Sequence, residues 1–231
     1  MNSAVPHPWT LTPREAIALQ KELASQVQVT GKLSHCRYVA GADVAYTRSQ
    51  QRLVAAVVLW DIQLSRITEY HLEKQPVEFP YVPGLLSFRE SPAVFAAFGR
   101  LSTRPDLLIV DGHGYAHPRR FGIACHLGVL LDIPTIGCAK SILVGEHQPV
   151  PDCVGAWVPL LDHGTVIGAA VRTRLHVRPV YVSIGHKRDL EEAIRWILQC
   201  SRGCRLPEPT RQAHILVTEA RQSGSQSKKP N

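Results

Sequence analysis

The chain has 231 residues, 45% of them hydrophobic and 19% charged, which supplies enough apolar side chain for a folded core and excludes a wholly disordered protein. Its formal net charge of +7 favours a polyanionic partner, although charge alone does not separate nucleic acid from a membrane surface. The longest apolar run, residues 53–60, is much shorter than the roughly 20 residues of a bilayer-spanning helix, and the N-terminus lacks a signal-peptide pattern. Six cysteines without a CxxC pair predict reduced thiols, and we expect a cytoplasmic protein with no membrane partner.

The first half of the chain predicts a helix, a set of three strands and a second helix. The first helix begins at a capping box, in which Thr12 caps the helix and Glu15 completes the box, and it extends to about Val29. Short polar turns separate three β-rich stretches, which favours an antiparallel meander. These stretches are residues 36–46, 53–62 and 66–74. A proline-rich segment follows, and the next helix is predicted to begin at Ser91 and Pro92.

In the second half, short apolar strands alternate with helices, a pattern typical of parallel strands buried on both faces. The predicted strands are residues 106–110, 133–139, 166–173 and 180–184, and the predicted helices are 121–131, 189–200 and one that begins near Thr210. An α/β fold with one mixed sheet, three antiparallel strands followed by parallel strands and flanked by helices, fits the whole pattern. We expect a single domain over residues 1–221 and a polar, disordered tail over residues 222–231.

Three acidic residues occupy positions that favour a shared metal site. Asp43 lies inside the apolar strand VAGADVAY, where a carboxylate is costly to bury unless it is paired or binds a cation. Asp111 ends the strand in LLIVDGHG, at the edge where α/β sheets bind ligands, and Glu90 precedes the predicted helix start. Taken singly, each acid could instead cap a turn or complement a helix dipole. Brought together, the three would repel one another unless divalent cations held them, and oxygen ligands suit Mg²⁺ or Mn²⁺ and phosphoryl transfer.

A lysine and a glycine-rich turn are expected at the same edge of the sheet. Lys140 directly follows the apolar segment TIGCA, so its ammonium group could neutralise charge on a phosphorus under attack. A solvated lysine at a strand end is the alternative. The glycines that follow Asp111 allow a ligand to approach the backbone closely, although the segment DGHG is often only a turn.

Four segments in this order, VAGADVAY, PYVPGLLSFRE, VDGHGYAHPRR and PTIGCAKS, resemble the endonuclease V family of deoxyinosine 3′-endonucleases, and RLPEPTRQAH adds to the likeness. The resemblance implies a ribonuclease H-like fold, Mg²⁺ as the cofactor with Mn²⁺ as a substitute, and hydrolysis of the second phosphodiester bond 3′ to deoxyinosine, leaving 3′-hydroxyl and 5′-phosphate ends. It assigns metal binding to Asp43, Glu90 and Asp111 and basic catalysis to Lys140. It also assigns His214 to the catalytic group, although an exposed helix histidine remains the alternative.

The same resemblance implies a wedge and a pocket for a base turned out of the duplex. Prolines stiffen the wedge while the aromatic ring of Tyr81 fills the space that the displaced base leaves. The wedge is Pro80, Tyr81, Val82 and Pro83, and the implied pocket residues are Gly84, Leu85, Gly112, His113, Gly114 and His117. Arg119 and Arg120 could hold phosphates, with a solvated basic turn as the alternative.

Two other interpretations stay open at this point. Metal-binding acids define the reaction and not the substrate, so a ribonuclease H-like nuclease acting on inosine-containing RNA or on branched or flap DNA is the first alternative. A non-catalytic nucleic-acid-binding module is the second, and the three acids argue against it because a basic groove has no use for buried carboxylates. We expect a monomer whose partner is DNA containing deoxyinosine, with inosine RNA as a further candidate.

Overall fold

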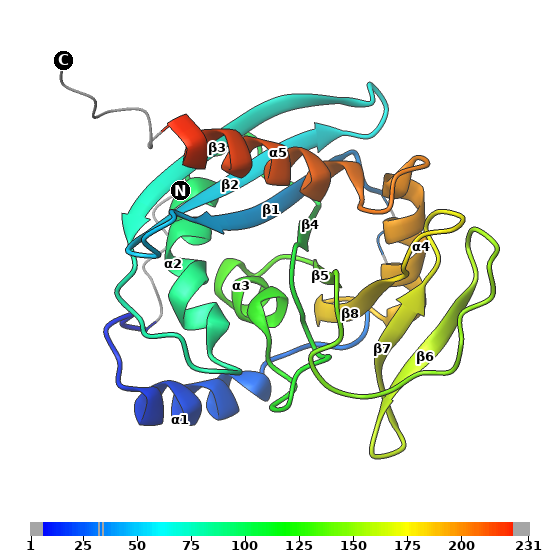
Figure 1. Cartoon of the computed structure of the whole chain (residues 1–231), viewed down its shortest axis with the longest axis horizontal. Helices are drawn as coiled ribbons and strands as arrows, with labels where there is room; N and C mark the ends of the chain where they lie inside the picture. Colours follow the sequence, from blue (N-terminus) through cyan, green and yellow to red (C-terminus); the bar gives the residue numbers. More distant parts are fainter. Residues whose placement is uncertain (1–6, 32, 34, 224–231) are drawn as a thin grey trace.

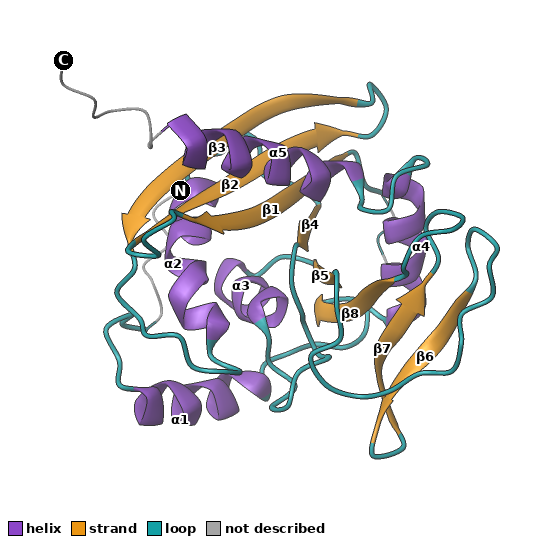
Figure 2. Ribbon diagram, in the orientation of Figure 1, coloured by secondary structure: helices purple, strands orange, loops and turns teal. Residues whose placement is uncertain are grey.

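One mixed sheet of eight strands, with helices on both faces, organises the computed structural model (Figures 1 and 2), which describes residues 7–31, 33 and 35–223. The strand order is β3-β2-β1-β4-β5-β8-β7-β6. The strands are β1 (Tyr38–Tyr46), β2 (Arg52–Asp61), β3 (Arg66–Pro76), β4 (Leu107–Val110), β5 (Thr135–Ala139), β6 (Trp157–Asp162), β7 (Thr165–Val171) and β8 (Val180–His186). The helices are α1 (Pro13–Ala24), α2 (Leu86–Phe98), α3 (Ile123–Leu131), α4 (Leu190–Ser201) and α5 (Glu208–Ser223).

The strand directions bring three carboxyl ends to one edge of the sheet. Strands β1, β2 and β3 form the predicted antiparallel meander, and β4 and β5 lie parallel to β1. The remaining strands, β8, β7 and β6, pair antiparallel, so the parallel part of the sheet is confined to its centre. Because β1, β4 and β5 point the same way, the residues that follow them meet at a common edge. The predicted mixed α/β sheet is confirmed.

Alternation along β1 divides the helices between the two faces of the sheet. Ala40 and Ala42 pack in the core cluster of α2 and α3, whereas Val39 packs in the cluster of α4. Helix α5 lies on the same face as α4 and across β1 and β2 (Figure 1). This close approach requires Gly41, because a Cβ added there would lie 2.1 Å from the carbonyl carbon of Pro209.

Helix α1 confirms the predicted start but not the predicted end. The Thr12 side chain accepts a hydrogen bond from the N–H of Glu15, and the Glu15 carboxylate accepts one from the N–H of Thr12. The helix ends at Ala24 and not near Val29.

Helix α2 corrects the sequence prediction more substantially. It begins at Leu86, so the predicted start at Ser91 is wrong and Pro92 lies within the helix. The earlier turn forms because Phe88, a fully buried side chain, packs against Ala16 and Leu85. Glu90 consequently lies in the second turn of α2, on the buried face of the helix.

Strand β6 was not predicted, because Pro159 interrupts its pattern. Proline is tolerated in an edge strand, and β6 is the last strand of the sheet.

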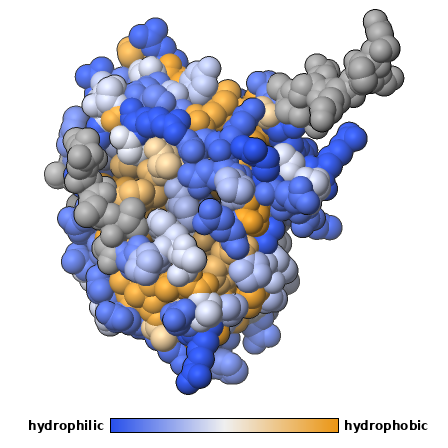
Figure 3. Space-filling model, turned by 90° about the vertical axis from the view of Figure 1, so that its left-hand side faces the viewer, coloured by the Kyte–Doolittle hydropathy of each residue, from blue (hydrophilic) through white to orange (hydrophobic). Residues whose placement is uncertain are grey.

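The side of the molecule that carries α1 and α2 shows apolar patches among hydrophilic residues (Figure 3). No helix within the described residues has the length and apolar composition to cross a bilayer. The predicted tail lies outside the described residues except for Gln222 and Ser223, which end α5.

Candidate active site

Asp43 and Asp111 lie next to each other at the edge where the central strands end. Asp43 is in β1, and the N–H of Asp111 donates a hydrogen bond to the carbonyl of Ala42 at 2.9 Å, which fixes the second acid directly after β4. Both carboxylates are nearly enclosed, with about a tenth of each side chain exposed. The sequence prediction that these two acids share one edge of the sheet therefore agrees with the structure.

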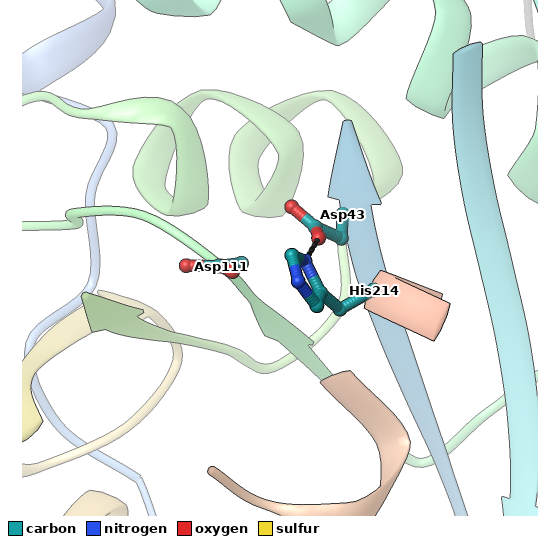
Figure 4. A group of neighbouring side chains, drawn as sticks. All are labelled: Asp43, Asp111 and His214. Atoms are coloured by element: carbon teal, nitrogen blue, oxygen red, sulfur yellow. Dashed lines mark hydrogen bonds and ion pairs between the residues drawn. The ribbon is translucent and has the colours of Figure 1, made fainter. Parts of the chain in front are cut away.

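Helix α5 adds His214 to the two carboxylates. Its Nδ1 lies 2.7 Å from Oδ2 of Asp43, a hydrogen bond drawn in Figure 4, which also shows the three side chains converging from β1, the end of β4 and α5. One ligand atom from each of Asp43, Asp111 and His214 lies within 4.8 Å of the other two. This spacing is compatible with three groups that surround one cation.

Lys140 completes the charged group at this edge. Its Nζ forms an ion pair with Oδ2 of Asp111, and its side chain remains 38% exposed, so the ammonium group faces both the acid and the solvent. The backbone of Lys140 is fixed from the other side, because the guanidinium of Arg205 donates a hydrogen bond to its carbonyl at 2.8 Å.

Glu90 lies close to this group but outside it. Its carboxylate, on α2, accepts a hydrogen bond from the Tyr46 hydroxyl at 2.8 Å, and the guanidinium of Arg89 lies 4.9 Å from the centre of the Tyr46 ring. Burial and the negative charges of Asp43 and Asp111 raise the pKa of Glu90 to about 8, against the hydrogen bond from Tyr46. Of the three predicted metal-binding acids, the structure thus clusters two, and it couples the third to them electrostatically.

The donor set fits a hard divalent cation. Burial, and after it the charge of Asp111, raise the pKa of Asp43 to about 6, against the opposing effects of Lys140 and His214. Crowded, desolvated carboxylates of this kind are stabilised when a cation binds between them. Carboxylate oxygens suit Mg²⁺ and Mn²⁺. Asp43 and Asp111 could hold such an ion, with His214 hydrogen-bonded to Asp43 beside them.

A cavity of about 210 Å³ opens directly beside the charged group. Its walls include residues that immediately follow Asp111 and Lys140 in the chain, so the cavity and the acids share one rim. Predicted residues in its lining are Tyr81, Val82, Pro83, Gly84, Gly112, His113 and His117. Residues that sequence reasoning missed are Leu86, Ser87, Gly122, Ile123, Ser141, Ile142 and Leu143.

Two predicted pocket residues, Leu85 and Gly114, and one predicted wedge residue, Pro80, do not line this cavity. Leu85 is 1% exposed and packs in the core with Phe88. Gly114 lies against β8, where an added Cβ would be 2.1 Å from the carbonyl oxygen of Ile184. Pro80 is exposed and precedes the lining residues in the chain. These three residues shape the walls and the wedge loop from outside the cavity.

The cavity is mainly apolar, and two of its lining residues each have one buried polar atom without a hydrogen-bond partner in the described part of the chain. Oγ of Ser87 and Nδ1 of His113 are buried and have no hydrogen-bond partner among the described residues. His117 is fully engaged by contrast, since Nε2 donates to the carbonyl of Gly84 at 3.0 Å and Nδ1 accepts from the N–H of Arg119 at 3.1 Å. Burial and the charge of Arg119 lower the pKa of His117 to about 4, which keeps its ring neutral. The wall of the cavity therefore holds two buried polar atoms without a partner among the described residues.

Tyr81 and the two arginines of the basic turn differ in their availability. Tyr81 is 71% exposed at the mouth of the cavity, as a wedge requires. Arg119 donates to the carbonyl of Gly84 at 2.7 Å, and Arg120 donates to the carboxylate of Asp162 at 2.6 Å. Because both guanidinium groups bond to the protein, they support the cavity wall and are not free phosphate ligands in this conformation.

Comparisons of the sequence find one family. A family model described as Endonuclease V matches residues 21–215. Endonuclease V of Gloeobacter violaceus is 53% identical over 227 residues, which cover 96% of this chain and 92% of the relative. Endonuclease V of a Roseiflexus species is 50% identical over 221 residues, which cover 96% of this chain and 99% of the relative.

Two solved structures to which the chain is similar are also Endonuclease V proteins. The crystal structure of Endonuclease V from Streptomyces avermitilis matches with a TM-score of 0.89 and 40% identity, covering 97% of this chain and all of that one. Endonuclease V of Ciona intestinalis, crystallised with a 24mer DNA containing an inosine followed by a ribo-adenosine, matches with a TM-score of 0.79 and 26% identity. That alignment covers 91% of this chain and 98% of the Ciona chain.

Proposed function

Because this chain belongs to the endonuclease V family, a family of nucleases for inosine-containing DNA, we propose that it hydrolyses the second phosphodiester bond 3′ to deoxyinosine. The products are a 3′-hydroxyl and a 5′-phosphate. The observation that carries this proposal is the shared rim of the 210 Å³ cavity and the cluster of Asp43, Asp111 and His214. A base held in the cavity would place nearby phosphates of its own strand beside the carboxylates.

The cavity suits a single base turned out of the duplex. Its apolar walls would contact the faces of a purine, and Ser87 Oγ and His113 Nδ1 would meet the polar edge of the base. Inosine pairs weakly, so less free energy is needed to unpair it than to unpair a normal base. Tyr81, exposed at the mouth, would occupy the space that the displaced base leaves in the stack.

The charged group would carry out the hydrolysis. Asp43 and Asp111 would hold a divalent cation, Mg²⁺ or Mn²⁺, with Glu90 nearby to complete the site. When bound, such an ion activates water as a nucleophile and withdraws charge from the phosphate. The ammonium group of Lys140 would stabilise the negative charge that develops as water attacks phosphorus and the bond to the 3′ oxygen breaks. The His214 hydrogen bond holds the Asp43 carboxylate in one orientation.

Mapping the nick on a duplex with one inosine tests the proposal. With Mg²⁺ we expect a single nick at the second bond 3′ to inosine, in the inosine strand only. Without a divalent cation, or with Asp111→Asn, we expect no nick. Nicking at another bond, or equal nicking of a duplex with adenosine in the same position, would refute the assignment.

Inosine-containing RNA is a second candidate substrate. The Ciona complex contains a ribo-adenosine directly after the inosine, so a ribonucleotide is accepted at that position by a relative with the same fold. Competition between an inosine DNA duplex and an inosine RNA strand in one reaction would measure the preference of this chain.

A further inference from the structure

A second and larger hollow lies away from the base cavity, between the C-terminal end of α4 and the loop that joins β7 to β8. Its volume is about 780 Å³, and Arg174, His176 and Arg202 are among its lining residues. In Figure 1 this loop lies beside α4. We call it the α4 groove.

The α4 groove opens at the same edge of the sheet as the acids. Val171, the last residue of β7, pairs with Val180, the first residue of β8, and Tyr181 pairs with Ala139 at the end of β5. The loop between β7 and β8 therefore emerges next to Lys140, which follows Ala139. A polymer that lies along this edge passes both sites.

Hydrogen bonds from one side chain fix the groove to the catalytic edge. The guanidinium of Arg205 donates to the carbonyls of Lys140 at 2.8 Å, Arg178 at 2.9 Å and Pro179 at 3.0 Å. The Thr173 hydroxyl donates in turn to the carbonyl of Arg205 at 2.7 Å. Hydrogen bonds therefore connect the groove wall to the backbone of Lys140. They fix the distance between the two for a ligand that contacts both.

The groove carries positive charge that the described residues do not neutralise. Arg174 and Arg202 are both exposed, and neither forms an ion pair within the part of the chain that the structure describes. Asp152, the acid beside the same loop, lies 2.9 Å from Nδ1 of His176 and 3.5 Å from Nε of Arg172. Two unpaired guanidinium groups in a hollow of this size, on a chain of net charge +7, complement a phosphodiester backbone.

The two hollows lie on opposite sides of the sheet edge. The base cavity is built from α2, α3 and the segment after β4, on one face, whereas the α4 groove is built on α4, which covers the other face. A strand with its lesion in the cavity and the scissile phosphate at the acids therefore continues toward the second face. Since the bond to be cut is 3′ to the lesion, the segment that continues is the 3′ segment.

We propose that the α4 groove binds the phosphodiester backbone of the substrate on the 3′ side of the nicked bond, with Arg174 and Arg202 contacting its phosphates. This assignment rests on the proposed function for its direction. It adds a site, outside the acids and the base cavity, that holds the product segment in line with the metal cluster.

The test compares two double variants in binding and in nicking. The double variant Arg174→Gln/Arg202→Gln removes the two groove charges. The control Arg14→Gln/Arg66→Gln removes two exposed arginines located on α1 and at the opposite edge of the sheet. Losing two phosphate contacts should lower the slope of log affinity against log salt by about 2 and weaken binding at low salt by about tenfold or more. The double variant Arg174→Lys/Arg202→Lys keeps both charges, so it should restore the slope. If the loss of slope came from misfolding of the loop, the lysines would not restore it.

Duplexes of different extent test the direction. We expect the groove variant to bind a duplex that is long on the 3′ side more weakly than wild type does, and to match wild type on a duplex that ends shortly after the nicked bond. A slope equal to that of the control variant, or a defect that depends on the 5′ side, would overturn the proposal. Nicking of the same duplexes by wild type is measured in parallel. If wild type does not nick inosine duplexes at all, the proposed function is wrong. If wild type nicks them normally and the groove variant behaves like wild type, only the assignment of the groove is wrong.

Discussion

The Glu90→Gln variant should make the metal-free protein more stable, and increasingly so as the pH rises. Glu90 is 7% exposed, and its pKa in the folded chain is about 8, against 4.5 for an unburied glutamate. Between these two pH values the folded state keeps a proton on Glu90 that the unfolded chain releases. The contribution of Glu90 to the free energy of unfolding is therefore complete below pH 4.5 and is lost as the pH rises toward 8. The slope is about 1.4 kcal/mol per pH unit, which amounts to about 3 kcal/mol at pH 7.

The assay is urea unfolding in EDTA between pH 5 and 8.5, with wild type and variant measured at each pH. An amide does not titrate, so the difference in stability between Glu90→Gln and wild type should grow through this range and level off above pH 8. Taking the difference cancels other titrations, including that of buried His117, whose lowered pKa of about 4 adds stability as the pH rises toward neutrality. The control is Glu191→Gln, on the exposed side of α4.

A difference in stability between Glu90→Gln and wild type that is flat across pH 5 to 8.5 would contradict the raised pKa of Glu90. So would an equal pH dependence in the Glu191→Gln control. Either result would mean that Glu90 is solvated or paired in solution and that the acids do not crowd one another.

Three further variants test the packing and the cavity. Gly41→Ala places a Cβ against the Pro209 backbone, so we expect the free energy of unfolding in urea to fall by about 1 to 3 kcal/mol. Displacement of α5 should also reduce nicking. Gly99→Ala, whose added Cβ has its nearest contact at 3.4 Å, is the control and should change neither quantity. Tyr81→Ala should weaken inosine binding while leaving the Mg²⁺ concentration for half-maximal nicking unchanged; equal binding of inosine and undamaged duplexes by both proteins would exclude the wedge. Ser87→Ala should lower affinity for an inosine duplex about threefold to tenfold, measured by fluorescence anisotropy, and an unchanged affinity would mean that its hydroxyl does not contact the base.

The sequence predicted the central part of the site because local rules suffice there. Asp43 and Asp111 occupy strand positions, and Lys140 follows a strand, so the rule that parallel strands end at one edge places all three together. His214 came only from the resemblance. Its position depends on α5 crossing β1 at Gly41, a tertiary contact between distant segments that leaves no periodic pattern in the sequence.

The remaining differences have tertiary causes as well. Proline at position 92 signalled a helix start, but burial of Phe88 extends α2 toward the N-terminus, and this extension places Ser87 in the cavity wall. The basic turn at Arg119 and Arg120 suggested free phosphate ligands, yet both guanidinium groups find partners in segments far along the chain. Local propensity does not record such partners.

Binding of Mn²⁺ measured by electron paramagnetic resonance tests most directly whether Asp43 and Asp111 hold one divalent cation at the edge of the sheet. We expect that wild type binds Mn²⁺, that Mg²⁺ displaces it, and that Asp43→Asn and Asp111→Asn each weaken its binding at least tenfold while Glu191→Gln does not. Unchanged Mn²⁺ affinity in both aspartate variants, with their folds intact, would contradict it.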